Sequence, residues 1–240
     1  MANCCRASGF VFKKQDKSES DRMFYVFTDE FGRLDIFAKA IRKITSKLKS
    51  GIDIFSISKV EFIQGKNKKT LTDAVFEQKF ENIKNSPKRF KTAYMICQIL
   101  DDLVKEQEKD KKIFILLKKC FEELNNNYLK EEKCDLIYYY FVWNLFSLLG
   151  FRPELYKCVN CSFKLEPAEI YFSSNSGGII CKKCCEKKYS LQKIKSDAVK
   201  ILRVILLKDI KKALKLKTKE EFKILLEDAT NNYGAYIMNK

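Results

Sequence analysis

Residues 21–40, DRMFYVFTDEFGRLDIFAKA, show the pattern from which the fold of the N-terminal part can be predicted. The four residues Asp29 to Gly32 are typical of a hairpin loop between two strands. In the second strand Leu34, Ile36 and Ala38 alternate with other residues, so they share one face. In the first strand, Phe24 and Val26 alternate with Tyr25 and Phe27, and either pair could be buried. The stretch therefore predicts a hairpin with one apolar face.

Similar strand patterns lie on both sides of this hairpin, between residues 9 and 77. A second hairpin loop is expected at Gly65 to Lys68. An antiparallel sheet of five such strands usually closes into a small barrel, because closure removes the exposed edges. The five expected strands lie in the stretches GFVFKK, DRMFYVFTDE, GRLDIFAKA, IDIFSISKVEFIQG and KTLTDAVFE.

Helical periodicity begins near Ser86, and two amphipathic helices are expected. The apolar stripe of the first holds Phe90, Ala93, Tyr94, Cys97, Leu100 and Val104, and that of the second holds Ile113, Phe114, Leu117, Cys120, Phe121 and Leu124. A third helix from about Asp135 is apolar nearly all round and is expected to be buried, with Gly150 and Pro153 ending it. Two more helices are expected from about Lys193 and Lys219.

The composition favours a polyanion as partner, because 47 basic residues oppose 31 acidic ones and the formal net charge is +16. A lysine-rich but merely solvated surface would give the same charge. No apolar run reaches the roughly 20 residues that span a bilayer, so no membrane association is expected. No secretion signal is recognisable, which indicates a cytoplasmic protein whose thiols stay reduced.

Four cysteines have the spacing of a zinc site: Cys158 and Cys161 form one CxxC pair, and Cys181 and Cys184 form another. Residues 169–172 and 178–180 between the pairs can form a hairpin, which gives a zinc-ribbon shape. Histidine is absent from the chain, so a metal site must use cysteine or carboxylate ligands. Four protein ligands leave no open position, and we therefore expect one structural Zn²⁺ rather than a catalytic one.

The cysteines could also have roles other than binding zinc. A redox centre or a disulfide staple fits the paired CxxC spacing and the expected cytoplasmic location less well. Cys185 is a surplus residue that could replace Cys184. The five remaining cysteines are expected in the protein core rather than at a metal: Cys4, Cys5, Cys97, Cys120 and Cys134.

The sequence offers no catalytic constellation, and no enzymatic activity is expected. It contains neither of the glycine-rich phosphate-binding motifs, GxxxxGK[ST] and GxGxxG, and no histidine for a catalytic triad. Its acidic pairs, Asp101-Asp102, Glu122-Glu123 and Glu131-Glu132, fall on expected helices among lysines, where they should face solvent.

The barrel suggests binding of single-stranded nucleic acid, in which bases stack on aromatic rings while lysines contact phosphates. We expect Phe37 on the solvent-facing side of the third strand. A basic segment, residues 39–49, follows directly and could contact phosphates. The candidate DNA-binding residues are Phe37, Lys39, Arg42, Lys43, Lys47 and Lys49.

Taken together, these stretches resemble the bacterial recombination mediator family RecO. The resemblance covers nearly the whole chain and is carried by residues 19–21, Phe27-Thr28, Gly32, Ser46 and Gly51, Gly177-Gly178 and the four cysteines. The sequence departs from the family at two positions, since Ala40 and Ser162 stand where glycine is usual. The first could alter the path of the basic segment, and the second makes a left-handed turn less comfortable.

The resemblance implies an α+β fold in four parts. These are an N-terminal five-stranded OB-type barrel in residues 1–80, a helical domain in residues 81–155 and 190–240, and an inserted Cys4 zinc ribbon in residues 156–189.

It also implies a function without catalysis in the cytoplasm, at the nucleoid. Family members bind single- and double-stranded DNA, anneal complementary strands, work with RecR, and help RecA replace single-strand-binding protein. The competing hypothesis is a zinc-ribbon module that binds RNA or protein in transcription or translation.

Overall fold

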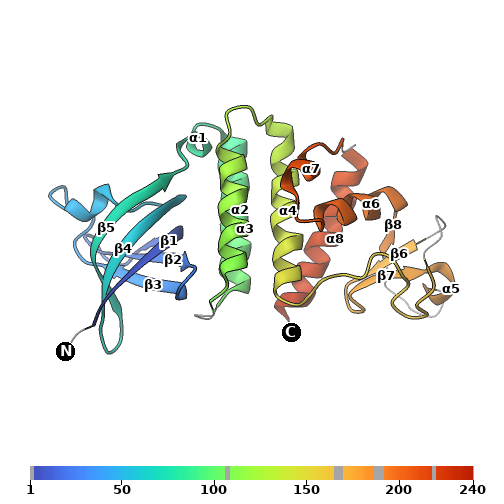
Figure 1. Ribbon diagram of the computed structural model, residues 1–240, viewed down its shortest axis with the longest axis horizontal. Helices are drawn as coiled ribbons and strands as arrows, with labels where there is room; N and C mark the ends of the chain where they lie inside the picture. Colours follow the sequence, from blue (N-terminus) through green and yellow to red (C-terminus); the bar gives the residue numbers. More distant parts are fainter. Residues whose placement is uncertain (1–2, 106–108, 165–169, 186–191, 218–219, 240) are drawn as a thin grey trace. The chain divides into compact units, whose positions relative to one another are not determined.

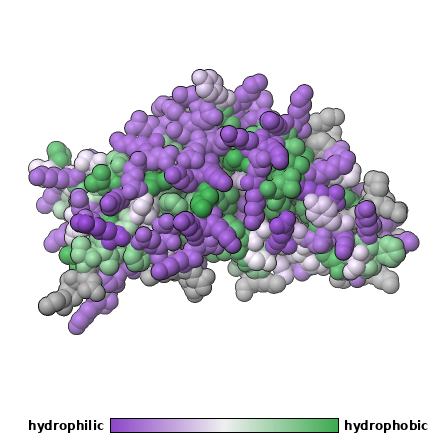
Figure 2. All heavy atoms as spheres, viewed as in Figure 1, coloured by the Kyte–Doolittle hydropathy of each residue, from purple (hydrophilic) through white to green (hydrophobic). Residues whose placement is uncertain are grey.

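A computed structural model describes the chain except residues 1–2, 106–108, 165–169, 186–191, 218–219 and 240 (Figure 1). The chain forms two compact units, residues 1–131 and 132–240. The expected boundary lay at residue 80, where the barrel ends. The first unit also includes the next three helices, because they pack on the outside of the barrel. Hydrophilic residues cover most of the face drawn in Figure 2.

The first unit contains a closed barrel with strand order β1-β2-β3-β5-β4, as expected from the sequence. Its strands are β1 (Asn3–Asp16), β2 (Arg22–Thr28), β3 (Gly32–Ala38), β4 (Ser56–Gln64) and β5 (Lys69–Lys79). The expectation of a wholly antiparallel sheet was wrong at one place, since β3 and β5 pair in parallel through Ile36 and Lys69. The reason is geometric: a closed ring with an odd number of strands cannot alternate direction throughout.

The hairpin of residues 21–40 has its predicted inward face. Leu34, Ile36 and Ala38 all lie in the core of the barrel, where Phe24 and Val26 of β2 meet them. Gly32 begins β3 with φ of +64°, in the left-handed region that glycine tolerates without strain. Phe24 and Val26 thus face the barrel core, while Phe27 is also buried but lies outside this core cluster.

Three helices complete the first unit: α1 (Glu81–Lys84), α2 (Pro87–Leu103) and α3 (Lys111–Asn125). α2 contacts β1, and α3 contacts β2. The ring of Phe10 on β1 lies 4.4 Å from that of Phe121 on α3, centroid to centroid. The helices thereby cover part of the outer surface of the barrel.

The expected apolar stripe of α2 was partly wrong, because Phe90 and Tyr94 are exposed. Its buried side instead contains Arg89, Thr92, Ala93, Ile96, Cys97 and Leu100. The guanidinium of Arg89 is acceptable there because it donates to the carbonyls of Leu124 and Leu129.

One acidic pair also departs from expectation, because Asp101 does not simply face solvent. Its carboxylate pairs with Lys13 at 2.7 Å and with Arg33 at 2.9 Å, and these bonds connect α2 to the barrel. Asp102 is exposed, as predicted.

The second unit is built around α4 (Cys134–Leu148), which is buried along most of its length and ends before Gly150. After residue 195 the described residues form three more helices: α6 (Ser196–Ile205), α7 (Ile210–Leu214) and α8 (Glu220–Met238). Two were expected, and the five-residue α7 is too short to show a helical period. On α4, Trp143 stacks on Tyr233 with 5.5 Å between ring centroids.

A small sheet belongs to the same unit, with strand order β7-β6-β8. Its strands are β6 (Ile170–Ser173), β7 (Gly178–Cys181) and β8 (Gln192–Ile194), and α5 (Lys182–Cys185) follows β7 directly. The expected hairpin is β6 and β7, although its residue 169 lies outside the described residues. The ring of Phe172 lies 5.9 Å from that of Trp143 and 5.6 Å from that of Tyr233. Aromatic packing therefore fixes this sheet to the helices.

Among the described residues, no helix has both the length and the apolar character needed to cross a bilayer.

Candidate metal centre and nucleic-acid interface

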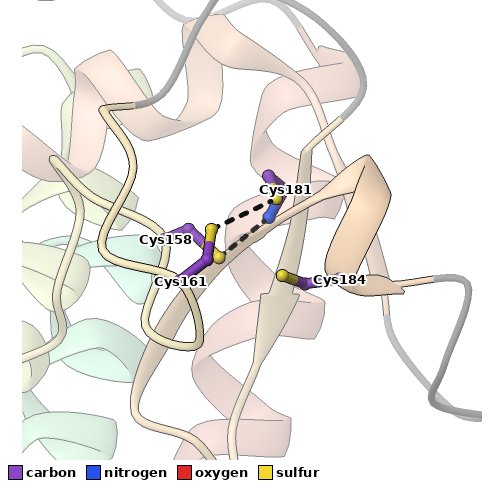
Figure 3. A group of neighbouring side chains, drawn as sticks. All are labelled: Cys158, Cys161, Cys181 and Cys184. Atoms are coloured by element: carbon purple, nitrogen blue, oxygen red, sulfur yellow. Dashed lines mark hydrogen bonds between the residues drawn. The ribbon is translucent and has the colours of Figure 1, made fainter.

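The cysteines of the two CxxC pairs converge on one point (Figure 3). The sulfur atoms of Cys158, Cys161, Cys181 and Cys184 all lie within 4.8 Å of one another, so together they could hold a metal ion. Cys181 ends β7, and Cys184 lies in α5. Cys185 is not part of the group. The structure thus brings together all four cysteines named from the sequence.

One sulfur–sulfur distance matches that of a tetrahedral zinc site. A Zn–S bond of about 2.3 Å places the sulfurs of a tetrahedral site ~3.8 Å apart. The Sγ atoms of Cys161 and Cys181 are separated by 3.8 Å. Four cysteines would leave no coordination position for water, which is the arrangement of a structural site.

Backbone N–H groups lower the pKa of Cys158 and so favour its thiolate form. Burial acts to raise the pKa of Cys158, but N–H groups of Cys181, Cys161 and Asn160 point at its sulfur and lower the pKa to about 6. The opposite holds for Cys184, where neighbouring thiols, Cys181 first, raise the pKa to about 12. Without a cation the four sulfurs therefore cannot all be ionised, whereas a divalent metal would stabilise four thiolates.

The backbone around the metal centre depends on residues with unusual φ. Ser162, which follows the first CxxC pair, has φ of +59°, so the left-handed turn forms although glycine is absent. Gly177 has φ of +70°. At Gly178 a Cβ atom would lie 2.4 Å from the carbonyl oxygen of Glu154, which explains why a glycine stands there.

The other cysteines follow the sequence interpretation with one exception. Cys97, Cys120 and Cys134 are buried, while Cys5 packs partly against the barrel core. Cys4 is exposed on β1, so its expected place in the core was wrong. The cause is the alternation of a strand, which turns adjacent residues to opposite faces.

The basic segment, residues 39–49, consists of turns that lead into the 3-10 helix η1 (Lys47–Ser50). Ile41 is buried in the barrel core, and Leu48 packs against the same cluster. These two apolar residues fix the segment and leave its lysines in solvent. Within the described residues, no ion pair is found for Lys39, Lys43, Lys47 or Lys49, and all four side chains are exposed.

The loop between β1 and β2 holds the start of the basic segment. The backbone N–H of Ala40 donates to Asp21 Oδ1 at 2.7 Å, and the N–H of Arg42 donates to the carbonyl of Ser20 at 3.0 Å. The hydrogen bond from Ala40 is the main reason why the pKa of Asp21 is lowered. Ala40 itself has φ of +55°, so it adopts the left-handed conformation that glycine would take more easily.

Arg42 differs from the lysines because its guanidinium already has partners. It donates to the carbonyl of Ser18 at 2.9 Å and lies 3.4 Å from the carboxylate of Asp16. Its contacts therefore position the basic segment, whereas the lysines remain available for an external anion.

Phe37 is half-buried on the outer face of β3. The ammonium of Lys68 lies 4.2 Å from the centroid of its ring, a cation–π contact that one face of the ring makes. Lys68 belongs to the β4–β5 hairpin loop and was not identified from the sequence. The lysine-rich turn GKNKK was the available signal, but only pairing of β3 with β5 brings this turn to Phe37.

A second group that the sequence did not reveal surrounds Asp53, beside a cavity of about 470 Å³ in the first unit. Lys14 and Lys84 donate to its two carboxylate oxygens at 2.6 and 2.7 Å. Burial acts to raise the pKa of Asp53, but the two ammonium groups prevail and lower it to about 2. The cavity wall near η1 also includes Lys49.

These features define an α+β protein in which an OB-type barrel with a basic segment is joined to a helical unit that includes a Cys4 ribbon. Residues 1–80 match the family described as recombination protein O N terminal, and residues 85–237 match recombination protein O C terminal. The chain belongs to the RecO family of DNA repair proteins.

Relatives support the same assignment over almost the whole chain. The DNA repair protein RecO of Dehalococcoides mccartyi is 32% identical over 98% of this chain and 91% of its own length. Those of Halalkalibacterium halodurans and Listeria welshimeri are 25% and 24% identical, over 95% and 98% of this chain and 87% and 92% of their own lengths.

Proposed function

We propose that this protein is a recombination mediator that binds single- and double-stranded DNA and anneals complementary strands without catalysing a reaction. The observation that supports this most directly is the basic segment, whose four lysines are exposed, have no ion pair among the described residues, and extend from a strand that carries a partly exposed phenylalanine.

Electrostatics would supply most of the affinity. Lysine binds phosphate as a point charge and reads no base, so sequence preference should be weak. Neutralising the phosphates of two strands lowers their repulsion while the bases stay free to pair. Phe37 would stack on a base of a single strand, with Lys68 close to the neighbouring phosphate.

The family resemblance extends the proposal to partners. We propose that the protein works with RecR and helps load RecA onto DNA coated by single-strand-binding protein. The ribbon would hold one structural zinc ion, and its reduced thiols agree with a location in the cytoplasm, at the nucleoid.

The test is an annealing assay with labelled complementary strands, bare and coated with single-strand-binding protein. The native chain should accelerate pairing in both cases. Lys43→Gln/Lys47→Gln should slow it, whereas the matched pair Lys112→Gln/Lys119→Gln on α3 removes the same charge and should leave the rate nearly unchanged. If the native chain does not accelerate annealing, the mediator proposal is rejected in favour of an RNA- or protein-binding ribbon module.

A further inference from the structure

The second unit contains a separate surface rich in aromatic and cationic side chains, beside the first CxxC pair. Tyr156 is 54% exposed and Phe163 is 76% exposed, although Trp143, Phe172 and Tyr233 of the same unit are buried. A single exposed ring needs no explanation, so these two are of interest because exposed cations surround them.

The backbone holds both rings in defined places. Lys157 and Lys164 form an antiparallel bridge, and the N–H of Cys158 donates to the carbonyl of Phe163 at 2.9 Å. The two aromatic residues thus lie on the two arms that enclose the first CxxC pair. A metal at the cysteines would fix these arms further.

Tyr156 is also supported from one side. The guanidinium of Arg203 lies 4.5 Å from the centroid of its ring and donates through Nε to the carbonyl of Leu155 at 3.1 Å. Arg203 therefore covers one part of the ring and leaves the rest exposed. A cavity of about 240 Å³ opens beside the ring, between Arg152, Pro153, Leu155 and Leu206.

The charge around these rings is positive. Arg152, Lys157, Lys164 and Lys183 are exposed, and none of the four has an ion pair within the part of the chain that the structure describes. Glu154 also lines the cavity, but its carboxylate accepts the N–H groups of Tyr156 and Lys157 at 2.7 and 3.2 Å. The acid thus stabilises the backbone turn that presents the aromatic ring.

We propose that this knuckle surface is a second binding site for single-stranded DNA. It is made of Arg152, Tyr156, Lys157, Phe163, Lys164 and Lys183. Exposed rings next to unpaired cations match a ligand with flat bases and a phosphate backbone. Tyr156 and Phe163 stack on bases, and the cations contact the phosphates. The inference rests on the proposed function. It gives one chain two binding sites for single strands, which is suitable for a protein that anneals them.

The experiment measures binding of a fluorescent oligothymidine to the full, zinc-loaded chain in which Lys43→Gln/Lys47→Gln has weakened the barrel site. Adding Tyr156→Leu/Phe163→Leu should lower the affinity about thirtyfold or more, since two stacking rings are lost and each contributes at least ~1 kcal/mol. The control Tyr128→Leu removes a tyrosine that is 94% exposed in the first unit and should leave the affinity unchanged. Zinc content checks that the ribbon is intact.

A second readout uses the native chain, so that a folding defect of the variant cannot decide the result. A strand with 5-iodouracil should crosslink to Tyr156 or Phe163 on irradiation. Unchanged affinity in the zinc-loaded variant, or crosslinks only within the barrel, would overturn the second site while leaving the proposed function intact. A native chain that neither binds nor anneals strands would overturn both.

Discussion

Asp53 contributes to the stability of the folded chain in a way that its neighbours in sequence do not reveal. It lies in a loop and has no acidic or basic neighbour in sequence, yet Lys14 of β1 and Lys84 of α1 both donate to it. Because its folded pKa is lowered from 3.8 to about 2, the ionised form is stabilised in the folded state. This stabilisation is complete above the pKa of the unfolded chain and is lost as the pH falls from about 4 to about 2.

We therefore expect Asp53→Asn to lower the free energy of unfolding by ~1–2 kcal/mol at pH 7, a figure reduced for the partial exposure of the carboxylate. The difference from the native chain should shrink as the pH falls from 4 toward 2. Urea unfolding at several pH values measures it. Asp102→Asn is the control, because it removes the same charge at an exposed position and should leave the free energy of unfolding nearly unchanged. A deficit that stays constant down to pH 2 would contradict the ionic origin.

Some non-glycine residues adopt a strained backbone conformation with positive φ. Ala40 and Ser162 both adopt left-handed backbone conformations, at the two positions where the resemblance led us to expect glycine. The hydrogen bond from the Ala40 N–H to Asp21 helps to offset this cost for Ala40. The left-handed turn therefore forms at both positions, although neither residue is glycine.

At the scale of elements, the ribbon is the clearest case of chemistry that spacing could predict. Two CxxC pairs separated by a hairpin predicted four candidate ligands, and the structure brings these four cysteines together. The third strand, β8, was missed because its three residues are too few to show an alternation. Its place beside β6 arises from pairing at a distance.

We expect Cys181→Ser to abolish stoichiometric zinc binding, because three thiolates and a hydroxyl form a much weaker site. Cys185→Ser should retain one zinc per chain, since Cys185 lies outside the cluster. Zinc content and thiol titration of the purified variants measure both. Loss of zinc in the Cys185 variant but not in the Cys181 variant would show that the ligand set is different.

At the scale of the whole molecule, the proposed binding of DNA depends on which basic side chains are available. A net charge of +16 attracts any polyanion, but only cations with no partner in the folded chain can exchange for counterions on binding. Arg42 is committed to Ser18 and Asp16, while Lys43 and Lys47 are not. Basic residues without a partner in the folded chain therefore predict phosphate contacts better than net charge does.

The slope of log affinity against log salt concentration should reflect this. Lys43→Gln/Lys47→Gln should reduce the slope for single strands by about 1.4, since each lost phosphate contact accounts for ~0.7. Lys112→Gln/Lys119→Gln removes the same charge and should leave the slope nearly unchanged. A titration of oligothymidine binding between low and moderate salt measures it, and equal slopes in both pairs would place the phosphate contacts elsewhere.

The sequence by itself determined the features that depend on local periodicity and spacing. These are the five strands, the inward face of residues 34–38, the buried helix α4, the four cysteines that converge and the position of the basic segment. Each follows from a pattern within a short stretch, because side-chain direction in a strand or helix repeats with a fixed period.

Only the tertiary structure decided what depends on residues far apart in the chain. The parallel closure of the barrel, the contact of Lys68 with Phe37, the two lysines on Asp53 and the anchoring of the ribbon through Phe172 all join distant segments. The physical reason is that such contacts are set by chain closure and packing in three dimensions, for which local sequence periodicity contains no signal.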